Sequence, residues 1–466
     1  MFRTGFASRR ITPRVGQEVP GLFARRLATG VHDDLYARAA VIDDGATCVA
    51  FVQTDAIALP ERLVTRARRL AARQCGIPGR NCLIAATHTH SGGPVFGGFL
   101  SEPDEEYVAF VAGEIAAAIA DAYHARRPAL PGISSAEAPG IAFNRRFRMK
   151  DGSQQTHPGK LNPNILEPAG PADPTVTVAG FSDPTDFRPF GCIVHFACHG
   201  THMNGTEYSA DYANWIINTL QAAYGPAFGV VFLNGACGDV TQVDNQSPRP
   251  LELGPYWCER TGRCVAGAAI HALAKVDYCT AATVAAVSVK VAVAVRTSTP
   301  PERKAARQLL KKHAVTADDV ETIYARELLE VDKMRRQTPV RRLDVMGIRI
   351  ADALFWGVPA ELFQAYAVDV QSVSPFSRTC CVELANGYNG YICTPEAFTG
   401  GGYEIRTARS SFLEPHAGDR VAAAAKRLAR RMFTGAESDI RRLRKRWPMF
   451  ADDEVLDGIR QITRNS

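Results

Sequence analysis

The chain has 466 residues, of which 46% are hydrophobic and 22% charged, a composition typical of a globular protein with a sizeable core. Its net charge of +6 is modest, and the basic runs at residues 430–431 and 441–446 lack interleaved aromatic residues. We therefore expect no nucleic-acid partner and interpret these runs as solvated helix faces.

Residues 1–16 contain arginines but no continuous apolar stretch, so the sequence does not predict a signal peptide. No apolar run reaches the roughly 18 residues that a membrane span requires. We expect a cytoplasmic protein without an integral membrane segment. Its twelve cysteines are scattered without a C-x-x-C pair, which favours reduced, buried thiols.

Residues 11–38 are rich in glycine, proline and arginine, which predicts a loop. Residues 145–173 lack periodicity, and we interpret them as an ordered surface loop over a cleft. Apolar or alternating runs predict strands over residues 39–43, 47–53, 82–86, 175–181, 191–196, 229–233, 281–295, 343–355, 357–361 and 381–385. Helical periodicity is found over residues 60–73, 105–125, 211–224, 257–274, 301–336, 362–372 and 415–433.

The interspersed strands and helices predict an α/β fold, with mixed central β-sheets flanked by helices. No linker or sequence repeat divides the chain, so we expect one large catalytic domain over residues 1–466. Within it, the charged residues 300–340 could be an inserted helical hairpin, and residues 435–466 are expected to form a basic helical tail.

A histidine pair follows the apolar strand predicted at residues 82–86, in the segment THTHSGG. Residues two apart in a strand face the same side, so His88 and His90 can point into one cleft. The glycines that follow allow backbone and ligand to approach closely. This pattern suits a divalent metal site, because neutral imidazole is a common ligand.

Two more apolar strands run into polar, glycine-containing turns. The first, CIVHFACHGTH, carries three histidines, and the second ends in NGACGDVT, where Asp239 is expected to set a turn. Because strand ends can converge on one site, the pattern favours His199 as a second metal ligand beside His88. We interpret His195 and His202 as supporting or structural residues.

Taken together, these stretches resemble the N-terminal catalytic domain of the neutral/alkaline, non-lysosomal ceramidase family. The resemblance is carried, in the family's order, by residues 87–92 (THTHSG), 196–201 (FACHGT), 234–241 (NGACGDVT) and 386–396 (NGYNGYICTPE). Weaker matches at residues 30–38, 144–145 and 357–361 fall in the same order.

The resemblance implies one catalytic zinc ion per chain. The family's ligands correspond to His88, His199, Glu361 and Tyr391. Two nitrogens, a carboxylate and a phenol oxygen suit Zn²⁺ and leave room for water. The resemblance also implies catalytic or substrate-facing roles for four residues: His90, Arg145, Thr241 and Tyr403.

The sequence departs from the family pattern at the proposed nucleophile. Thr241-Gln242 stands where the family has Ser-Pro, and no dedicated base is evident beside Thr241, so we prefer a metal-activated water as the nucleophile. A secretion signal and a C-terminal immunoglobulin-like domain, both usual in the family, are not seen here. We therefore do not assign ceramide as the substrate.

We expect a zinc-dependent hydrolase that cleaves a linear amide bond of a small N-acyl substrate. The metal would lower the pKa of its bound water from near 16 to about 7 and polarise the substrate carbonyl. His90 would exchange a proton with the water or the leaving amine. Arg145 and Tyr403 would stabilise the tetrahedral oxyanion.

Other functions stay open from the sequence. The same zinc site could cleave an ester or a lactone. His-x-His pairs also begin the motifs of barrel amidohydrolases and of the metallo-β-lactamase fold, but the SGG that follows and the irregular strand order disfavour both. A protein without catalytic activity, whose histidines bind a ligand or serve the structure alone, is the remaining alternative.

Overall fold

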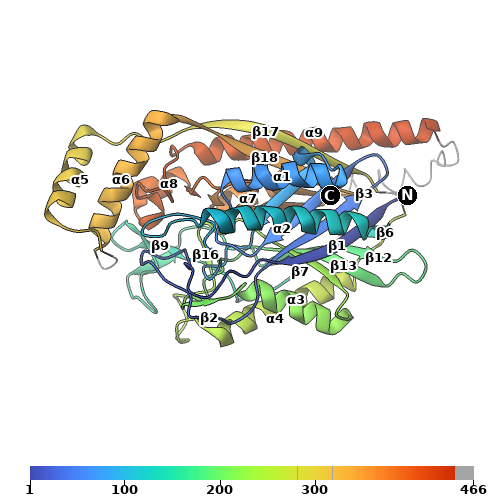
Figure 1. The fold of residues 1–466 in the computed structure, drawn as a ribbon, viewed down its shortest axis with the longest axis horizontal. Helices are drawn as coiled ribbons and strands as arrows, with labels where there is room; N and C mark the ends of the chain where they lie inside the picture. The colour runs from blue at the N-terminus through green and yellow to red at the C-terminus, as the bar shows by residue number, and fades with distance from the viewer. Residues whose placement is uncertain (281, 317–318, 447–466) are drawn as a thin grey trace.

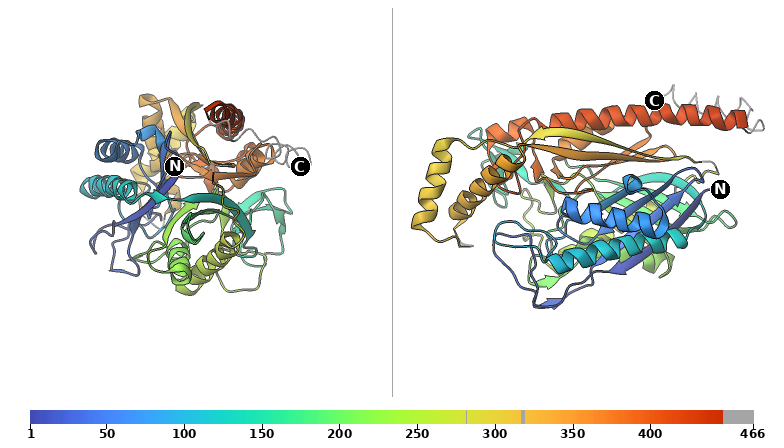
Figure 2. Two further views of the ribbon diagram at one scale, coloured as in Figure 1. Left: turned by 90° about the vertical axis from the view of Figure 1, so that its right-hand side faces the viewer. Right: turned by 45° about the horizontal axis from the view of Figure 1, so that its top comes forward.

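The computed structural model describes residues 1–280, 282–316 and 319–446, with side chains as far as residue 433. Mixed β-sheets form its centre, and helices cover their outer faces (Figures 1 and 2). Side chains from the three larger sheets meet in a shared apolar interface that includes Phe51, Phe181, Ile193, Ile348 and Phe355. The predicted α/β fold with mixed sheets flanked by helices is therefore confirmed.

The same order of elements occurs three times along the chain. Each unit has three antiparallel strands, a helix, a fourth strand parallel to the third, and a second helix. The first unit is β1 (Arg3–Arg10), β3 (Tyr36–Asp43), β4 (Cys48–Thr54), α1 (Glu61–Cys75), β5 (Cys82–Ala86) and α2 (Glu105–His124). The second is β7 (Leu130–Glu137), β12 (Thr175–Ser182), β13 (Pro189–Phe196), α3 (Tyr212–Tyr224), β15 (Gly229–Asn234) and α4 (Pro255–Leu273). The third is β17 (Val284–Ala294), β18 (Val340–Ile350), β19 (Ala353–Gly357), α7 (Gln364–Ser372), β21 (Arg378–Val382) and α9 (Ala417–Arg446).

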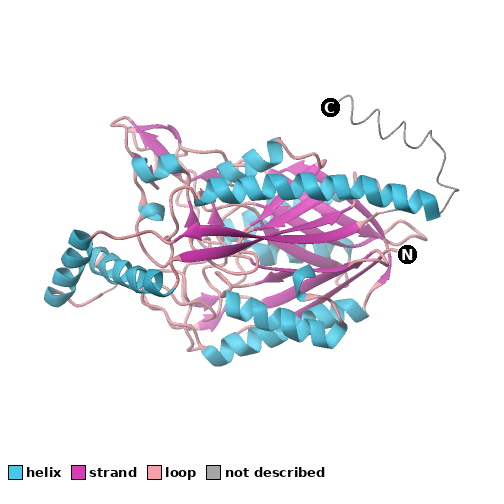
Figure 3. Ribbon diagram, turned by 90° about the horizontal axis from the view of Figure 1, so that it is seen from above, coloured by secondary structure: helices cyan, strands magenta, loops and turns pink. Residues whose placement is uncertain are grey.

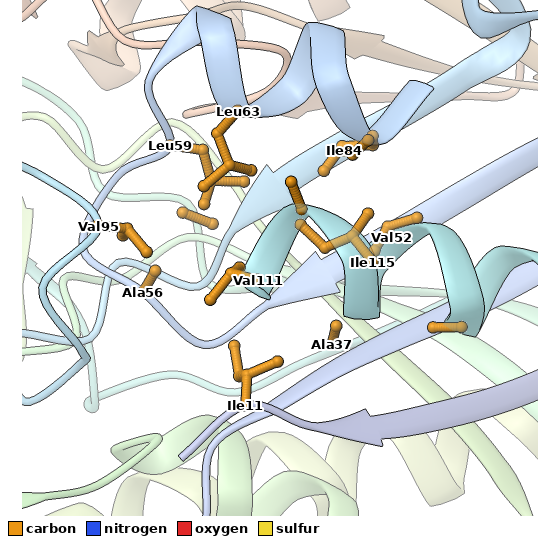
Figure 4. Close-up of a cluster of buried hydrophobic side chains, with 14 of the residues drawn as sticks. Ile11, Ala37, Val52, Ala56, Leu59, Leu63, Ile84, Val95, Val111 and Ile115 are labelled. Carbon is orange, nitrogen blue, oxygen red and sulfur yellow. The ribbon is translucent and has the colours of Figure 1, made fainter. Parts of the chain in front are cut away.

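The two helices of each unit pack together on the outer face of their own sheet. Helix α1 does so through Leu63, Val64, Ala67 and Ala71, which recur at helical spacing and are buried. Asp104 caps the N-terminus of helix α2, and its carboxylate accepts hydrogen bonds of 3.0 Å from the N–H groups of residues 106 and 107. Figure 4 shows the apolar side chains enclosed between these helices and the first sheet.

The parallel strand pairs of the three units end in one region. Thr89, just after β5, pairs with Gly200, just after β13. Ala85 of β5 pairs with Ala385, just after β21. The loops that follow these strands therefore meet, as expected for a binding site outside the carboxyl ends of parallel strands.

Shorter elements lie in the connections between these strands and helices. They are η1 (Gly79–Asn81), β2 (Gly30–Val31), β6 (Arg127–Pro128), β8 (Phe143–Asn144), β9 (Arg146–Met149), β10 (Gln154–Thr156), β11 (Ile165–Pro168), β14 (Glu207–Tyr208), β16 (Val240–Thr241), α5 (Pro300–Lys312), α6 (Val320–Gln337), β20 (Glu361–Leu362), β22 (Tyr391–Ile392), α8 (Pro395–Gly400) and η2 (Tyr403–Ile405). Helices α5 and α6 pack together at one end of the molecule (Figure 3). Whether they are an insertion stays a prediction. No described helix is both long and apolar enough to cross a membrane.

Several predicted elements differ from those of the structure. Strands β1 and β7 were missed because polar residues interrupt their apolar pattern. Residues 145–173 contain a small sheet of the order β10-β9-β11 rather than an irregular loop, and its largely exposed strands leave little periodicity in the sequence. The run 343–355 is a hairpin that turns at Ala351 (φ 51°). Residues 447–466 of the predicted basic tail lie outside the described residues.

Candidate metal centre

His88 lies two residues beyond the end of β5 and has a left-handed backbone with φ 67°. This conformation is uncommon for a residue other than glycine and persists where the surroundings fix it. The His88 N–H donates to the carbonyl of Ala56 (3.0 Å), and its Nδ1 donates to that of Ile57 (2.8 Å). The loop after β4 thus sets both the backbone and the ring of His88.

Three imidazoles gather at this point, of which those of His88 and His199 are buried and that of His90 is half-buried. His88 and His90 have ring centroids 4.9 Å apart, and His88 and His199 have centroids 4.4 Å apart. Each ring donates through Nδ1 to a backbone carbonyl: His88 to Ile57, His90 to Gly21 (2.9 Å) and His199 to Cys237 (2.7 Å). One ring nitrogen of each histidine lies within 4.8 Å of those of the other two. Such Nδ1 bonds leave Nε2 as the nitrogen available to a metal.

Glu361, in β20, brings a carboxylate to the same point. Its Oε2 lies 3.2 Å from Nε2 of His88 and 3.4 Å from Nε2 of His199. Tetrahedral ligands with zinc bonds near 2.1 Å are about 3.4 Å apart, so these separations suit a shared cation. Within the described structure, neither Oε2 nor the three Nε2 atoms has a hydrogen-bond partner, although all are buried. Buried polar atoms without partners are costly, and a metal ion would satisfy Oε2 and the Nε2 atoms of His88 and His199, leaving Nε2 of His90 free to accept a proton.

The protonation states also fit metal ligation. Burial and the charge of Arg145 lower the pKa of His199 to about 3, so its ring is neutral. Burial, together with the charge of His88, holds the pKa of His90 well below its ordinary value. Burial disfavours a charge on Glu361, but attraction to His88 and contacts with both histidines outweigh it and hold its pKa low. Burial lowers the pKa of His88, but the Glu361 carboxylate outweighs it and raises that pKa, so a metal would displace a proton there.

Tyr391 lies beside Glu361 because β22 pairs with β20 in parallel, with these two residues as direct partners. Nη2 of Arg145 donates to Tyr391 Oη (3.2 Å) and to the carbonyl of Gly238 (2.7 Å). Tyr403 is partly exposed, and its ring centroid lies 6.1 Å from that of Tyr391 and 5.3 Å from Cζ of Arg145. Arg145, Tyr391 and Tyr403 therefore form one group next to the histidines.

Thr241 lies in β16 and is buried. Its hydroxyl donates to Oε1 of Gln242 (2.8 Å), which also accepts from Thr201 (3.0 Å). Among the described residues, no histidine or carboxylate accepts the Thr241 proton. A neutral amide oxygen is a poor base, so the surroundings of Thr241 suit a hydrogen-bonding role better than nucleophilic attack.

The other candidates from the sequence have structural partners. His195 contacts the carbonyl of Cys381 through Nε2 (2.6 Å). His202 is enclosed between Asp211 (2.7 Å) and Thr261 (2.9 Å). Asp239 is buried and accepts from the N–H of Gln364 and the side chain of Asn144, both at 2.8 Å, so it joins two segments in addition to forming a turn.

Three carboxylate or phenol groups at the site were missed from the sequence. Tyr388 donates to Oε1 of Glu361 (2.8 Å). Glu404 is buried and accepts from Arg145 Nε (3.1 Å) and Arg146 Nη1 (2.7 Å), so two buried guanidinium groups share one carboxylate. Glu383 follows β21 directly, and burial raises its pKa to about 8. The sequence gives little sign of them: Tyr388 lies in the NGYNGY motif, Glu383 lies inside the predicted strand 381–385, and Glu404 stands in no recognisable motif.

Two comparisons with known proteins gave matches. Residues 23–215 match the family model described as neutral/alkaline non-lysosomal ceramidase, N-terminal, which includes His88, His90, Arg145 and His199. The solved structure of a neutral ceramidase from Pseudomonas aeruginosa has 19% identity and a TM-score of 0.70, covering 92% of this chain and 75% of that chain. A structure described as a ceramidase complexed with C2 has 19% identity and a TM-score of 0.69, covering 91% and 74%. At this identity the structures show the shared fold. The search among curated proteins gave no significant match.

Proposed function

We propose that the chain is a metal-dependent hydrolase that cleaves the amide bond of a small N-acyl lipid, because residues 23–215 match the N-terminal ceramidase family model. The observation that carries this proposal is the meeting of four buried donor atoms that make no hydrogen bond: Nε2 of His88, His90 and His199, and Oε2 of Glu361. A purely structural cluster would satisfy these atoms with hydrogen bonds.

We assign His88, His199 and Glu361 as the closest ligands, with Tyr391 as the fourth and zinc as the metal. The separations around Glu361 support the first three, and the pairing of β20 with β22 supports Tyr391. Two imidazoles with oxygen ligands suit Zn²⁺. A cation there would supply a water of lowered pKa and polarise the substrate carbonyl.

The chain's own residues would handle the proton and the developing charge. The Nδ1–H of His90 is held by Gly21, so Nε2 is the atom of this ring that takes up or returns a proton. Arg145 is buried; although burial opposes its charge, Tyr403, Tyr391 and Glu404 raise its pKa well above the ordinary value. Its fixed positive charge, with the phenol of Tyr403, would stabilise the tetrahedral oxyanion.

Metal analysis combined with a substrate series tests this function. We expect about one zinc per chain in the purified protein and turnover of N-acyl amides that varies with acyl length. Matched esters with the same acyl groups test the alternative ester activity. His88→Ala and His199→Ala should lose metal and activity together, whereas His195→Gln should keep both. Full turnover without metal, or in His88→Ala, would refute the assignment.

A further inference from the structure

The carboxylate of Glu383 binds the backbone of two segments at the site, the loop after β15 and strand β20. Glu383 is fully buried, and its Oε2 accepts from the N–H groups of Cys237 (2.9 Å) and Leu362 (3.2 Å). Its Oε1 accepts from Sγ of Cys237 (2.8 Å). One oxygen atom thus joins the loop after β15 to strand β20.

The loop after β15 and strand β20 each fix one predicted metal ligand. The carbonyl of Cys237 accepts from Nδ1 of His199 (2.7 Å), so the position of this peptide sets the direction of the imidazole. Leu362 follows Glu361 directly, and its carbonyl accepts from the N–H of Gly238 (2.9 Å). A shift of either loop would therefore change the separation of the His199 and Glu361 donors.

The backbone of Glu383 extends this link to the loops that carry both histidine ligands. Its N–H donates to the carbonyl of Asn234 (3.1 Å). The side-chain amide of Asn234 donates to the carbonyls of Thr87 and Cys198, both at 3.1 Å. These residues immediately precede His88 and His199.

We propose that Glu383 is a positioning residue. It accepts the backbone N–H groups of Cys237 and Leu362, and so holds the loop that orients His199 and the strand that carries Glu361 at the separation required for metal binding. The inference rests on the proposed metal site. Without the acceptor, the two buried N–H groups could be satisfied only by water or by movement of the loops. The contact acts through oxygen geometry, so a neutral side chain of the same shape should replace it.

Two substitutions separate geometry from charge. In Glu383→Gln, the amide oxygen can accept from both N–H groups while the NH₂ group faces Sγ of Cys237, a weak acceptor. Glu383→Met has a similar length but no acceptor. Affinity for Zn²⁺ is measured by chelator competition on metal-free protein, and the visible spectrum of the Co²⁺ form reports the ligand geometry.

We expect Glu383→Gln to bind Zn²⁺ within about threefold of wild type, and Glu383→Met to bind about 10- to 100-fold more weakly with an altered Co²⁺ spectrum. Asp344→Asn is the control and should match wild type in Zn²⁺ affinity. It removes a largely buried carboxylate of β18 that pairs with Arg68 of α1. If Glu383→Met does not fold, Glu383→Asp, with an acceptor one methylene shorter, should also weaken binding.

Equal losses of Zn²⁺ affinity in Glu383→Gln and Glu383→Met would overturn the inference, because they would show that the charge of the side chain matters rather than its geometry. Unchanged affinity in Glu383→Met would overturn it as well. A wild-type protein that binds no Zn²⁺ would refute both the metal site and the role of Glu383. Zinc binding without hydrolysis of any N-acyl compound would refute the proposed function alone.

Discussion

The phenol of Tyr388 donates a hydrogen bond of 2.8 Å to Oε1 of Glu361, while Oε2 of the same carboxylate faces His88 and His199. The Tyr388 ring itself is held by an edge contact with Phe96, with centroids 4.8 Å apart. The two oxygens of Glu361 therefore have different surroundings. One is held by the protein, and the other is directed at the histidine cluster.

Tyr388→Phe should weaken Zn²⁺ binding because it removes the group that orients Glu361. Partners of metal ligands typically contribute about 10- to 100-fold in affinity or activity, and we expect a loss in that range. Chelator competition measures it. Tyr366→Phe, which removes a phenol beside Asp419, is the matched control and should bind zinc like wild type. Identical affinities in the two variants would contradict this role of Tyr388.

Thr241→Val should retain most of the activity if the hydroxyl only donates a hydrogen bond. We expect kcat to fall by less than about 30-fold, in line with the loss of one hydrogen bond. Thr241→Ser should be close to wild type in single-turnover assays. A drop in kcat of roughly 10⁴-fold or more in Thr241→Val, as expected for loss of a nucleophile, would instead place Thr241 in the chemistry.

Gly238→Ala should disturb the site through backbone contact. A Cβ at this position would lie 2.8 Å from the carbonyl oxygen of Glu361 and 2.9 Å from that of Leu362, so the two loops would have to separate. We expect weaker zinc binding and lower kcat. Gly267→Ala, in α4, meets nothing within 4 Å and should be stabilising by about 1 kcal/mol with unchanged zinc affinity. Normal metal binding in Gly238→Ala would show that the close approach is not needed.

His195 should make the protein less stable in mild acid. Burial lowers its pKa below the ordinary 6.5, so below that pH the unfolded chain binds a proton that the folded chain does not. The resulting stability is present near neutral pH and is lost as the pH falls through 6.5 towards the folded pKa. His195→Gln can still donate to Cys381, so its denaturant midpoint should decrease less between pH 7 and pH 5. Parallel pH profiles for variant and wild type would contradict this.

The sequence predicted the elements with a strong apolar signal, and it singled out several residues that the fold brings together, among them His88, His90 and His199. Helix α1 and strand β5 have buried, periodic side chains, and His88 was assigned correctly to the end of a strand. Strand alternation was the reason for placing His90 on the same side as His88, and it does not apply, because both histidines lie beyond the end of β5. The left-handed backbone at His88 brings the two rings together instead. Glu361 and Tyr391 required the family resemblance, since neither stands in a local pattern that indicates a ligand.

The remaining contacts depend on tertiary structure. Glu404 meets Arg145, and Glu383 meets Cys237, only after distant segments have packed together, so local patterns cannot reveal them. The threefold order of elements is also hidden, because strands such as β1 and β7 keep little apolar alternation and the connections differ in length. The ligand roles of His88, His199, Glu361 and Tyr391 stay predictions that the experiments above would test.

Each of the three repeated units contributes one donor to the proposed centre: His88 follows β5, His199 follows β13 and Glu361 follows β19. A single bound ion would therefore act as a cross-link that ties the beginning, middle and end of the polypeptide together. Its removal would release constraints on loops that are long in sequence, where closure entropy is largest. Melting of the protein with its metal would then be more cooperative than melting of the chelated form, in which the units could loosen one at a time.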